Sequence, residues 1–464
     1  MSRAQSVKPG LATESYIGLQ YRYGSPKVNL FPGMERILLL SVAENPIWDR
    51  KMRIGMLVAL CLAVLCATAS AAEYRVLHSF CAQANCPDGQ FPVAPLTMDG
   101  QGNLYGTTSL GGLRQVGAVF QIGRTGGTPT YHRLYSFTIC AGCGTGSNPQ
   151  SPVMLDASGA IYGTAYNGGT RGAGTLFKLT EIAGRWRAHV FHDFCTSSFC
   201  SDGSNPISGG FYAQARAGAP YDGVSDVYGV TFAGGQSPYG VLYRWTPKGG
   251  EHIARSFCLQ TNCADGAQPN GEVAFNDAGY ACGTTRAGGS AQHGTLYCLE
   301  DGDASWSYSF CSRASCEDGA GPFAGVAPDG NGNLIGTTRY GGRYGQGVVY
   351  AISTGAGPHD ERVLHNFCSK ADCPDGRSPM GGVLLVNGSI YGTASRGGKY
   401  DGGTIYRIDA NGHTTVLHSF CRLAGCPDGY GPQAGLATDG NGHFFGTATQ
   451  GGRYGSGTVF ELDL

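Results

Sequence analysis

The sequence predicts an all-β fold, a seven-bladed β-propeller with four antiparallel strands in each blade. Three observations predict it: a glycine-rich motif recurs seven times, each repeat contains four strand-like runs, and the two ends of the repeat region complete one another. Glycine makes up 77 of the 464 residues and aromatic residues make up 11%, a composition that favours tight turns between short strands. No amphipathic helix of useful length follows residue 71.

The repeat is defined by a Tyr-Gly-Thr motif that is followed by Gly-Gly, four further residues and another Gly. Its copies read YGTTSLGG, YGTAYNGG, YGVTFAGG, CGTTRAGG, IGTTRYGG, YGTASRGG and FGTATQGG. Their central glycines, mostly 53 to 57 residues apart with one interval of 66, are Gly106, Gly163, Gly229, Gly283, Gly336, Gly392 and Gly446. A fixed period of this size indicates a solenoid, a propeller or an array.

Each repeat is expected to supply four strands. In the last repeat the first three are AGLATD, HFFGTAT and GTVFELD, and the preceding unit ends in TTVLHSF as its fourth strand. The turn DGNG joins the first two runs, as expected for a hairpin.

The ends of the repeat region distinguish a ring from a solenoid. Residues 73–80, EYRVLHSF, form a fourth strand without a blade, and residues 457–464, GTVFELDL, form a third strand without a fourth. Pairing the two completes the seventh blade and removes an open sheet edge. A solenoid would instead need capping units, and none is visible in the sequence.

The N-terminal region predicts export. Arg50, Lys51 and Arg53 precede the apolar run at residues 54–66, and Ala69-Ser70-Ala71 fits a cleavage site for a signal peptidase. We therefore expect an overlong, disordered N-terminal segment at residues 1–51, a signal peptide at 52–71 and a single propeller at 72–464. The mature chain would contain no transmembrane segment, and its location would be periplasmic or extracellular.

The repeat, with its Y-G-T motif, its G-G-x4-G loop and its final V-F/L-Y strand, resembles the GloVer tandem-repeat family. The resemblance covers roughly residues 73 to 464. It implies an exported bacterial protein, and the family carries over no catalytic residues to this sequence. Members are described as having a choice of C-terminal anchor, whereas here Leu464 ends the last predicted strand with no anchoring segment after it, which argues against surface anchoring.

Sixteen of the eighteen cysteines follow residue 80 and predict disulfide bonds. Seven pairs each follow the phenylalanine that ends a fourth strand: Cys81 with Cys86, Cys140 with Cys143, Cys195 with Cys200, Cys258 with Cys263, Cys311 with Cys316, Cys368 with Cys373 and Cys421 with Cys426. A turn of four residues brings two Cα atoms to about 5.5 Å, within disulfide range. Cys282 and Cys298 break the repeat and predict a cross-strand disulfide in blade four.

Two other interpretations of the cysteine pairs are less favoured. A zinc site needs four converging ligands, and pairs on successive blades lie too far apart to provide them. The sequence CAGC, from Cys140 to Cys143, resembles a redox motif. Its position in the repeat is that of the other six pairs, so we expect the same local disulfide, which we call a clip, in a loop that is two residues shorter. We therefore expect no metal and no cofactor.

The candidate binding face carries the G-G-x4-G loops and the cysteine loops, because both connections open on the same side of a propeller. Binding residues are concentrated on loops that a rigid scaffold holds in place. The candidate ligand-binding residues are Arg114, Arg343, Tyr344, Lys399, Tyr400, Arg453 and Tyr454. Aromatic faces, guanidinium groups and carboxylates together suit glycans or peptides.

A net charge of −1 gives no reason to expect a nucleic-acid partner. Our first hypothesis is an exported, non-catalytic binding or scaffold module for extracellular glycan or protein, expected to be a monomer. The alternatives are a propeller enzyme of the polysaccharide lyase or glycosidase type and a purely structural envelope protein. No catalytic residue is assigned, although Asp222 and Asp226 lie in the main break of the repeat, at residues 209–226.

Overall fold

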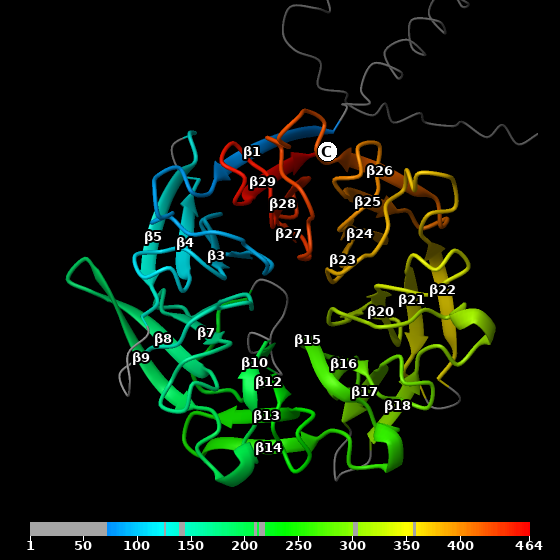
Figure 1. The fold of residues 1–464 in the computed structure, drawn as a ribbon, viewed down its shortest axis with the longest axis horizontal. Coiled ribbons are helices and arrows are strands. Elements are labelled where there is room, and N and C mark those ends of the chain that lie inside the picture. Colours follow the sequence, from blue (N-terminus) through cyan, green and yellow to red (C-terminus); the bar gives the residue numbers. More distant parts are fainter. Residues whose placement is uncertain are drawn as a thin grey trace, which may run out of the picture. The chain divides into compact units, whose positions relative to one another are not determined.

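Seven antiparallel sheets form a closed ring in the computed structural model (Figure 1). The structure describes residues 72–124, 127–138, 144–207, 211–212, 219–299, 305–355 and 359–464. The predicted all-β, seven-bladed propeller is confirmed. The segments 1–51 and 52–71, predicted to be an overlong N-terminus and a signal peptide, lie outside the described residues. In the described part of the chain, no helix has the length and apolar character needed to cross a membrane.

Each blade has four main strands that run in order from the axis outward. Blades one to three consist of β2 (Thr97–Met98), β3 (Leu104–Thr108), β4 (Ala118–Gly123) and β5 (Thr130–Ser136); β6 (Met154–Leu155), β7 (Ile161–Ala165), β8 (Thr175–Ile182) and β9 (Arg185–Asp193); and β10 (Ser204–Pro206), β12 (Val227–Ala233), β13 (Val241–Thr246) and β14 (Gly250–Ser256). A short extra strand, β11 (Phe211–Tyr212), also pairs with β12.

The remaining blades follow the same order. Blades four to seven consist of β15 (Ala267–Phe275), β16 (Ala281–Ala287), β17 (Thr295–Leu299) and β18 (Ser305–Ser309); β19 (Ala327–Pro328), β20 (Asn333–Thr338), β21 (Val348–Ser353) and β22 (Glu361–Asn366); β23 (Leu384–Val386), β24 (Ser389–Ala394), β25 (Thr404–Ile408) and β26 (Thr414–Ser419); and β27 (Ala437–Thr438), β28 (His443–Ala448), β29 (Thr458–Asp463) and β1 (Glu73–Ser79). Three cysteine loops contain short 3-10 helices, η1 (Ser198–Cys200), η2 (Thr261–Cys263) and η3 (Ala314–Cys316).

The central glycine of each Tyr-Gly-Thr motif makes room for an aromatic ring on the next strand. Gly106 and Phe120 are direct partners across β3 and β4, and a Cβ atom on Gly106 would lie 2.6 Å from the phenylalanine ring. The other six blades repeat this pair as Gly163–Phe177, Gly229–Tyr243, Gly283–Tyr297, Gly336–Tyr350, Gly392–Tyr406 and Gly446–Phe460. Any larger residue at the glycine would therefore displace the ring.

The same rings pack against the neighbouring blade. Phe80, which follows β1, has its ring centroid 5.2 Å from that of Phe120 in the first blade. The other six interfaces contain Phe137–Phe177, Phe194–Tyr243, Phe257–Tyr297, Phe310–Tyr350, Phe367–Tyr406 and Phe420–Phe460. All of these rings are fully buried. Since burying one such side chain contributes about 1.5–3 kcal/mol, this repeated pair is a major part of every blade–blade interface.

The threonine of the motif joins neighbouring blades by a hydrogen bond. The Thr393 hydroxyl donates to the Ala434 carbonyl at 2.8 Å, and the Thr447 hydroxyl donates to the Ala94 carbonyl at 3.2 Å. Thr447 is in the last blade and Ala94 in the first, so the hydrogen bond also crosses the point of ring closure. The motif therefore serves packing within and between the blades.

The N-terminal strand closes the ring as predicted. Strand β1 pairs with β29 in antiparallel register from Glu73 opposite Asp463 to Ser79 opposite Thr458. Glu461 on β29 is buried and forms ion pairs with Arg75 on β1 and, at 2.9 Å, with Arg124 of the first blade. One buried carboxylate thus links the two ends of the repeat region to the neighbouring blade.

We expect Glu461→Ala to lower the free energy of unfolding by about 3 kcal/mol, because it leaves two arginines without their shared carboxylate. Denaturant unfolding followed by tryptophan fluorescence measures the change. Glu181→Ala is the matched control, since Glu181 is exposed on β8, the third strand of another blade. Equal stability of the two variants would contradict a stabilising role for the Glu461 ion pairs.

Candidate functional site

The cysteine loops are closed by disulfide bonds. The structure joins Cys81–Cys86, Cys195–Cys200, Cys258–Cys263, Cys311–Cys316, Cys368–Cys373 and Cys421–Cys426, together with the cross-strand pair Cys282–Cys298. Within the loops the Cα atoms are 3.9–4.0 Å apart, closer than expected. Both cysteines of each of these six loops have positive φ, which curls the chain tightly, and the bond holds this unfavourable conformation.

One predicted clip lies where the structure gives no description. Cys140 and Cys143 both fall in the gap between residues 138 and 144, outside the described residues. The bond between Cys140 and Cys143 therefore stays a prediction, made by analogy with the six described loops.

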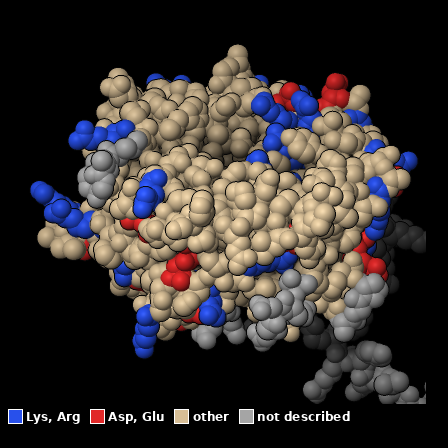
Figure 2. Space-filling view, turned by 60° about the horizontal axis from the view of Figure 1, so that its bottom comes forward, with Lys and Arg blue, Asp and Glu red and all other residues tan. Residues whose placement is uncertain are grey.

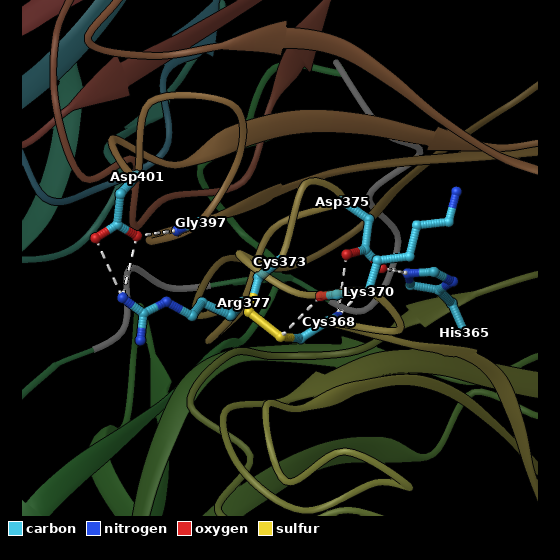
Figure 3. Close-up of a disulfide and its surroundings, with 8 residues drawn as sticks. All are labelled: His365, Cys368, Lys370, Cys373, Asp375, Arg377, Gly397 and Asp401. Carbon is cyan, nitrogen blue, oxygen red and sulfur yellow. Dashed lines mark hydrogen bonds and ion pairs between the residues drawn. A yellow bond between two sulfur atoms is a disulfide. The ribbon is translucent and has the colours of Figure 1, made fainter.

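The aspartate of each described cysteine loop satisfies the loop's own backbone. In the loop of blade five, the Cys368 N–H donates to Asp375 at 3.1 Å and His365 Nε2 lies 3.1 Å from the same carboxylate (Figure 3). Loop N–H groups likewise donate to Asp88, Asp202, Asp265, Asp318 and Asp428. These carboxylates are therefore engaged in loop structure and are not free to coordinate a ligand.

Four histidines lie two residues before a strand-final phenylalanine, and three of them contact the loop aspartates, whereas Nε2 of His192 is buried without a hydrogen-bond partner among the described residues. His78 lies 3.1 Å from Asp88 and His418 lies 3.2 Å from Asp428. Burial alone would raise the pKa of Asp88 and Asp428, but hydrogen bonds from the histidines and from backbone N–H groups outweigh it and lower the pKa below its usual value. Tyr308 takes the same place beside its own loop aspartate.

In six repeats the G-G-x4-G loop is hydrogen-bonded to the described cysteine loop next to it. The Cys373 carbonyl accepts hydrogen bonds from both Gly376 and Gly398, at 2.9 Å each. The carbonyls of Cys86, Cys200, Cys263, Cys316 and Cys426 accept the same pair of bonds in their own repeats. The two loop types therefore form one fixed unit on the same face of the ring, which we call the loop face.

The last glycine of each G-G-x4-G loop packs against the next blade. A Cβ atom on Gly457 would lie 2.5 Å from the Pro92 ring of the first blade, and the Phe91 N–H donates to the Ser456 carbonyl at 2.9 Å. The same glycine–proline contact occurs at all seven junctions. Backbone contacts thus hold the loop face rigid, and the side chains at the loop tips remain available.

The seven predicted ligand-binding residues lie on the tips of these loops and are all exposed. In three successive blades the cation lies over the adjacent tyrosine ring: Arg343 at 5.9 Å from the Tyr344 centroid, Lys399 at 5.5 Å from Tyr400 and Arg453 at 5.6 Å from Tyr454. Arg114 has no such tyrosine, because Gln115 follows it where the other three loops have tyrosine after the cation. Within the described residues no contact joins one pair to the next, so the structure brings together each pair and not the whole set.

A second group of cations and rings lies closer to the axis and was not among the predicted residues. We call Phe232, Arg286, Phe323, Arg339 and Tyr340 the rim cluster. The Arg286 guanidinium lies 4.5 Å from the Phe232 centroid and 5.9 Å from that of Phe323, and the Arg339 guanidinium lies 5.0 Å from Phe323 and 4.9 Å from Tyr340. Cations and rings therefore alternate across blades three, four and five.

The sequence contained a signal for the rim cluster. Phe232, Arg286 and Arg339 occupy one repeat position, two residues before Gly-Gly, where the second strand from the axis ends. Aligning the seven copies shows two arginines at this position in adjacent blades. What the alignment does not show is that Phe323, on the connection into blade five, fills the space between them.

The central strands contribute one unusual carboxyl group. Glu272 on β15, the innermost strand of blade four, packs its backbone against Gly325 of the next blade. The corresponding position holds proline or glycine in the other copies. Burial raises the pKa of Glu272 to about 7, and no other described charged group contributes to the shift.

Two further candidate sites are accounted for by structural contacts. Asp222 accepts hydrogen bonds from the N–H groups of Val224 and Ser225, and Asp226 lies 3.6 Å from Arg244. The one histidine–cysteine cluster with metal-ligand spacing in the described residues contains His293 with Cys311 and Cys316, whose sulfurs are bonded to each other. Neither group is an assembled catalytic or metal site.

The sequence matches the family model of the Gloeobacter/Verrucomicrobia repeat three times, over residues 63–225, 213–373 and 356–464. These matches span the ring and confirm the resemblance inferred from the repeat motif. No curated protein matches the sequence. Among solved structures, virginiamycin B lyase from Staphylococcus aureus is similar at 12% identity and a TM-score of 0.49, covering 85% of this chain and 99% of that one. A putative 6-phosphogluconolactonase from Bacteroides uniformis reaches 14% identity and a TM-score of 0.46, covering 75% and 88%. At these scores the likeness carries no argument about function.

We expect the stability contributed by Glu272 to fall as pH rises from about 4.5 to 7. The folded state holds the proton with a raised pKa, so the unfolded state releases it first and ionisation favours unfolding by up to about 3 kcal/mol above pH 7. Glu251 and Glu361, whose pKa burial also raises to about 7, act in the same direction. The measurement is therefore the difference between wild type and Glu272→Gln in urea unfolding from pH 4.5 to 8.

The difference should shift steadily in favour of Glu272→Gln across this range. Glu317→Gln, which alters an exposed carboxylate in a cysteine loop, is the matched control. A wild type and a Glu272→Gln variant with parallel pH profiles would show that the carboxyl of Glu272 is ordinarily solvated.

Proposed function

The chain belongs to the Gloeobacter/Verrucomicrobia repeat family, and we propose that it is an exported, non-catalytic binding or scaffold module. It would hold extracellular glycan or protein on the loop face of the propeller. The observation that carries the proposal is the repetition of an exposed cation–tyrosine pair, Arg343 with Tyr344, Lys399 with Tyr400 and Arg453 with Tyr454, on three successive blades.

The backbone of these loop tips is fixed, whereas their side chains are exposed. The Arg343 N–H donates to the side chain of Asn366, and the Arg453 N–H donates to the side chain of Ser79. A rigid backbone lowers the entropy lost when a ligand binds. Tyrosine faces and cationic groups then provide stacking and oriented hydrogen bonds, a combination that suits sugars and polar peptides.

The disulfide bonds support an oxidising compartment. Each described clip holds two cysteines with positive φ, so loss of the bond would release an unfavourable loop conformation. Such bonds persist outside the cytosol, which agrees with the predicted signal peptide. The proposal therefore includes a periplasmic or extracellular location.

A propeller enzyme is the second candidate, and Glu272 is the observation that favours it. A carboxyl group with a pKa of about 7 can act as a general acid at neutral pH. The other two glutamates whose pKa is about 7, Glu251 and Glu361, lie on outer strands. Glycoside hydrolysis by the usual route needs two carboxyl groups at one site, so Glu272 alone is incomplete.

We expect the oxidised protein to bind glycans on an array and the variant Arg343→Ala/Arg453→Ala to bind its best ligand at least tenfold more weakly. The loss follows from removing two charged hydrogen-bond donors. Titration calorimetry gives the dissociation constants, and Arg187→Ala, an exposed arginine on the outer strand β9, is the control. Turnover of a polysaccharide, abolished by Glu272→Gln, would replace the binding proposal with the enzymatic one.

A further inference from the structure

We propose that the rim cluster is a binding site for acidic polysaccharide, in which Arg286 and Arg339 contact the carboxylates of uronic-acid residues. This inference rests on the proposed binding function and names its ligand class. It adds charge-specific contacts to those of the loop tips, at a different part of the loop face, where the second strands end.

The two guanidinium groups are held in place by neighbouring side chains. Arg286 lies between the rings of Phe232 and Phe323, and its Nε donates to Gln268 Oε1 at 2.9 Å. Arg339 lies near Phe323 and Tyr340. Phe323 is common to both contacts, so one ring from blade five positions the arginines of two blades. Planar donors fixed in this way lose little conformational entropy when a carboxylate binds.

Neither arginine has a carboxylate partner within the described residues. The arginines that form ion pairs there are Arg75, Arg124, Arg244, Arg313 and Arg377. Nε of Arg339 is also buried without a hydrogen-bond acceptor. An unpaired, partly desolvated guanidinium costs free energy, and an anionic ligand would remove that cost.

The loop aspartates do not neutralise this region, because they accept hydrogen bonds from their own loops. Figure 2 shows Lys and Arg side chains at the upper right of a hollow in the molecule, with acidic side chains beside some of them. The net charge of the chain is only −1, so this basic character is local. A local cluster of cations selects an anionic ligand.

The arrangement favours a polysaccharide over an acidic peptide or a single small anion. Two cations on adjacent blades, separated by a phenylalanine ring, match a polymer that carries a charge on repeated units. Phe232 and Phe323 are partly exposed, so their remaining ring surface can pack against the apolar faces of sugar rings. A small anion would engage one arginine and leave the other unpaired.

The test compares polygalacturonate with its fully methyl-esterified form, which has the same backbone without charge. Biolayer interferometry on the oxidised protein measures dissociation constants for wild type, Arg286→Ala, Arg286→Ala/Arg339→Ala and Arg286→Lys/Arg339→Lys. We expect polygalacturonate to bind at least tenfold more tightly than the ester. Each alanine substitution should raise the dissociation constant for polygalacturonate about tenfold. The dissociation constant of the lysine variant should lie between those of wild type and the double alanine variant.

Two control variants separate the rim cluster from other surfaces. Arg187→Ala removes an exposed charge on the outer strand β9 and should retain wild-type affinity. Arg343→Ala/Arg453→Ala alters the loop tips and should weaken the binding of polygalacturonate and of its ester by the same factor, whereas the rim variants should weaken the binding of polygalacturonate alone. Because Arg286 is exposed, we expect Arg286→Ala to fold normally. This single variant therefore tests the inference even if the double variant Arg286→Ala/Arg339→Ala does not fold.

The failure of this inference is distinguishable from failure of the proposed function. Equal binding of the acid and the ester, full retention of affinity in the rim variants, or equal binding of poly-L-aspartate would overturn the rim-cluster inference while leaving a binding module in place. Binding to no glycan or peptide at all would overturn both. Selective loss of polygalacturonate binding in the rim variants supports both.

Discussion

The fold depends on one aromatic ring in each blade. The ring on the third strand lies over a glycine of the second strand and against a phenylalanine of the preceding blade, as Phe460 does with Gly446 and Phe420. It therefore joins strand to strand and blade to blade with the same atoms. A larger residue at the glycine would displace the ring from both contacts, which explains why the motif keeps glycine at this position in all seven copies, even where its tyrosine is replaced.

The remaining parts of the repeat motif stabilise the loop face around these rings. The clip cysteines hold backbone with positive φ, the loop aspartates accept N–H groups, and the last glycine of each G-G-x4-G loop meets the proline of the next blade. The residues most often associated with chemistry, Cys, His and Asp, are thereby used for structure. Function is left to positions at which the copies differ, which is where the loop-tip cations and the rim cluster lie.

The ring could be predicted from the sequence because its determinants are local and repeated. Strand number, the pairing of residues 73–79 with 458–463 and the cross-strand Cys282–Cys298 bond all follow from spacing and alternation. The rim cluster could not be predicted in the same way. Arg286, Phe323 and Arg339 meet through a contact between adjacent blades, and spacing along the sequence does not define how side chains of different blades meet. The role of the histidines could not be predicted from the spacing of the repeats either, because His365 and Asp375 meet only when the cysteine loop folds back on its strand.

Sevenfold repetition has a consequence for specificity. A site made only of repeated residues would offer seven equivalent weak contacts, whereas in the described part of the ring the Arg286–Phe323–Arg339 arrangement lies only across blades four and five. Glu272 likewise occurs once, at a position that holds proline or glycine elsewhere in the ring. Both departures lie at or near blade four, which also carries the additional Cys282–Cys298 disulfide between its second and third strands. This cross-strand bond ties β16, the strand that carries Arg286, to β17, so the strand that presents this arginine is covalently held to its neighbour.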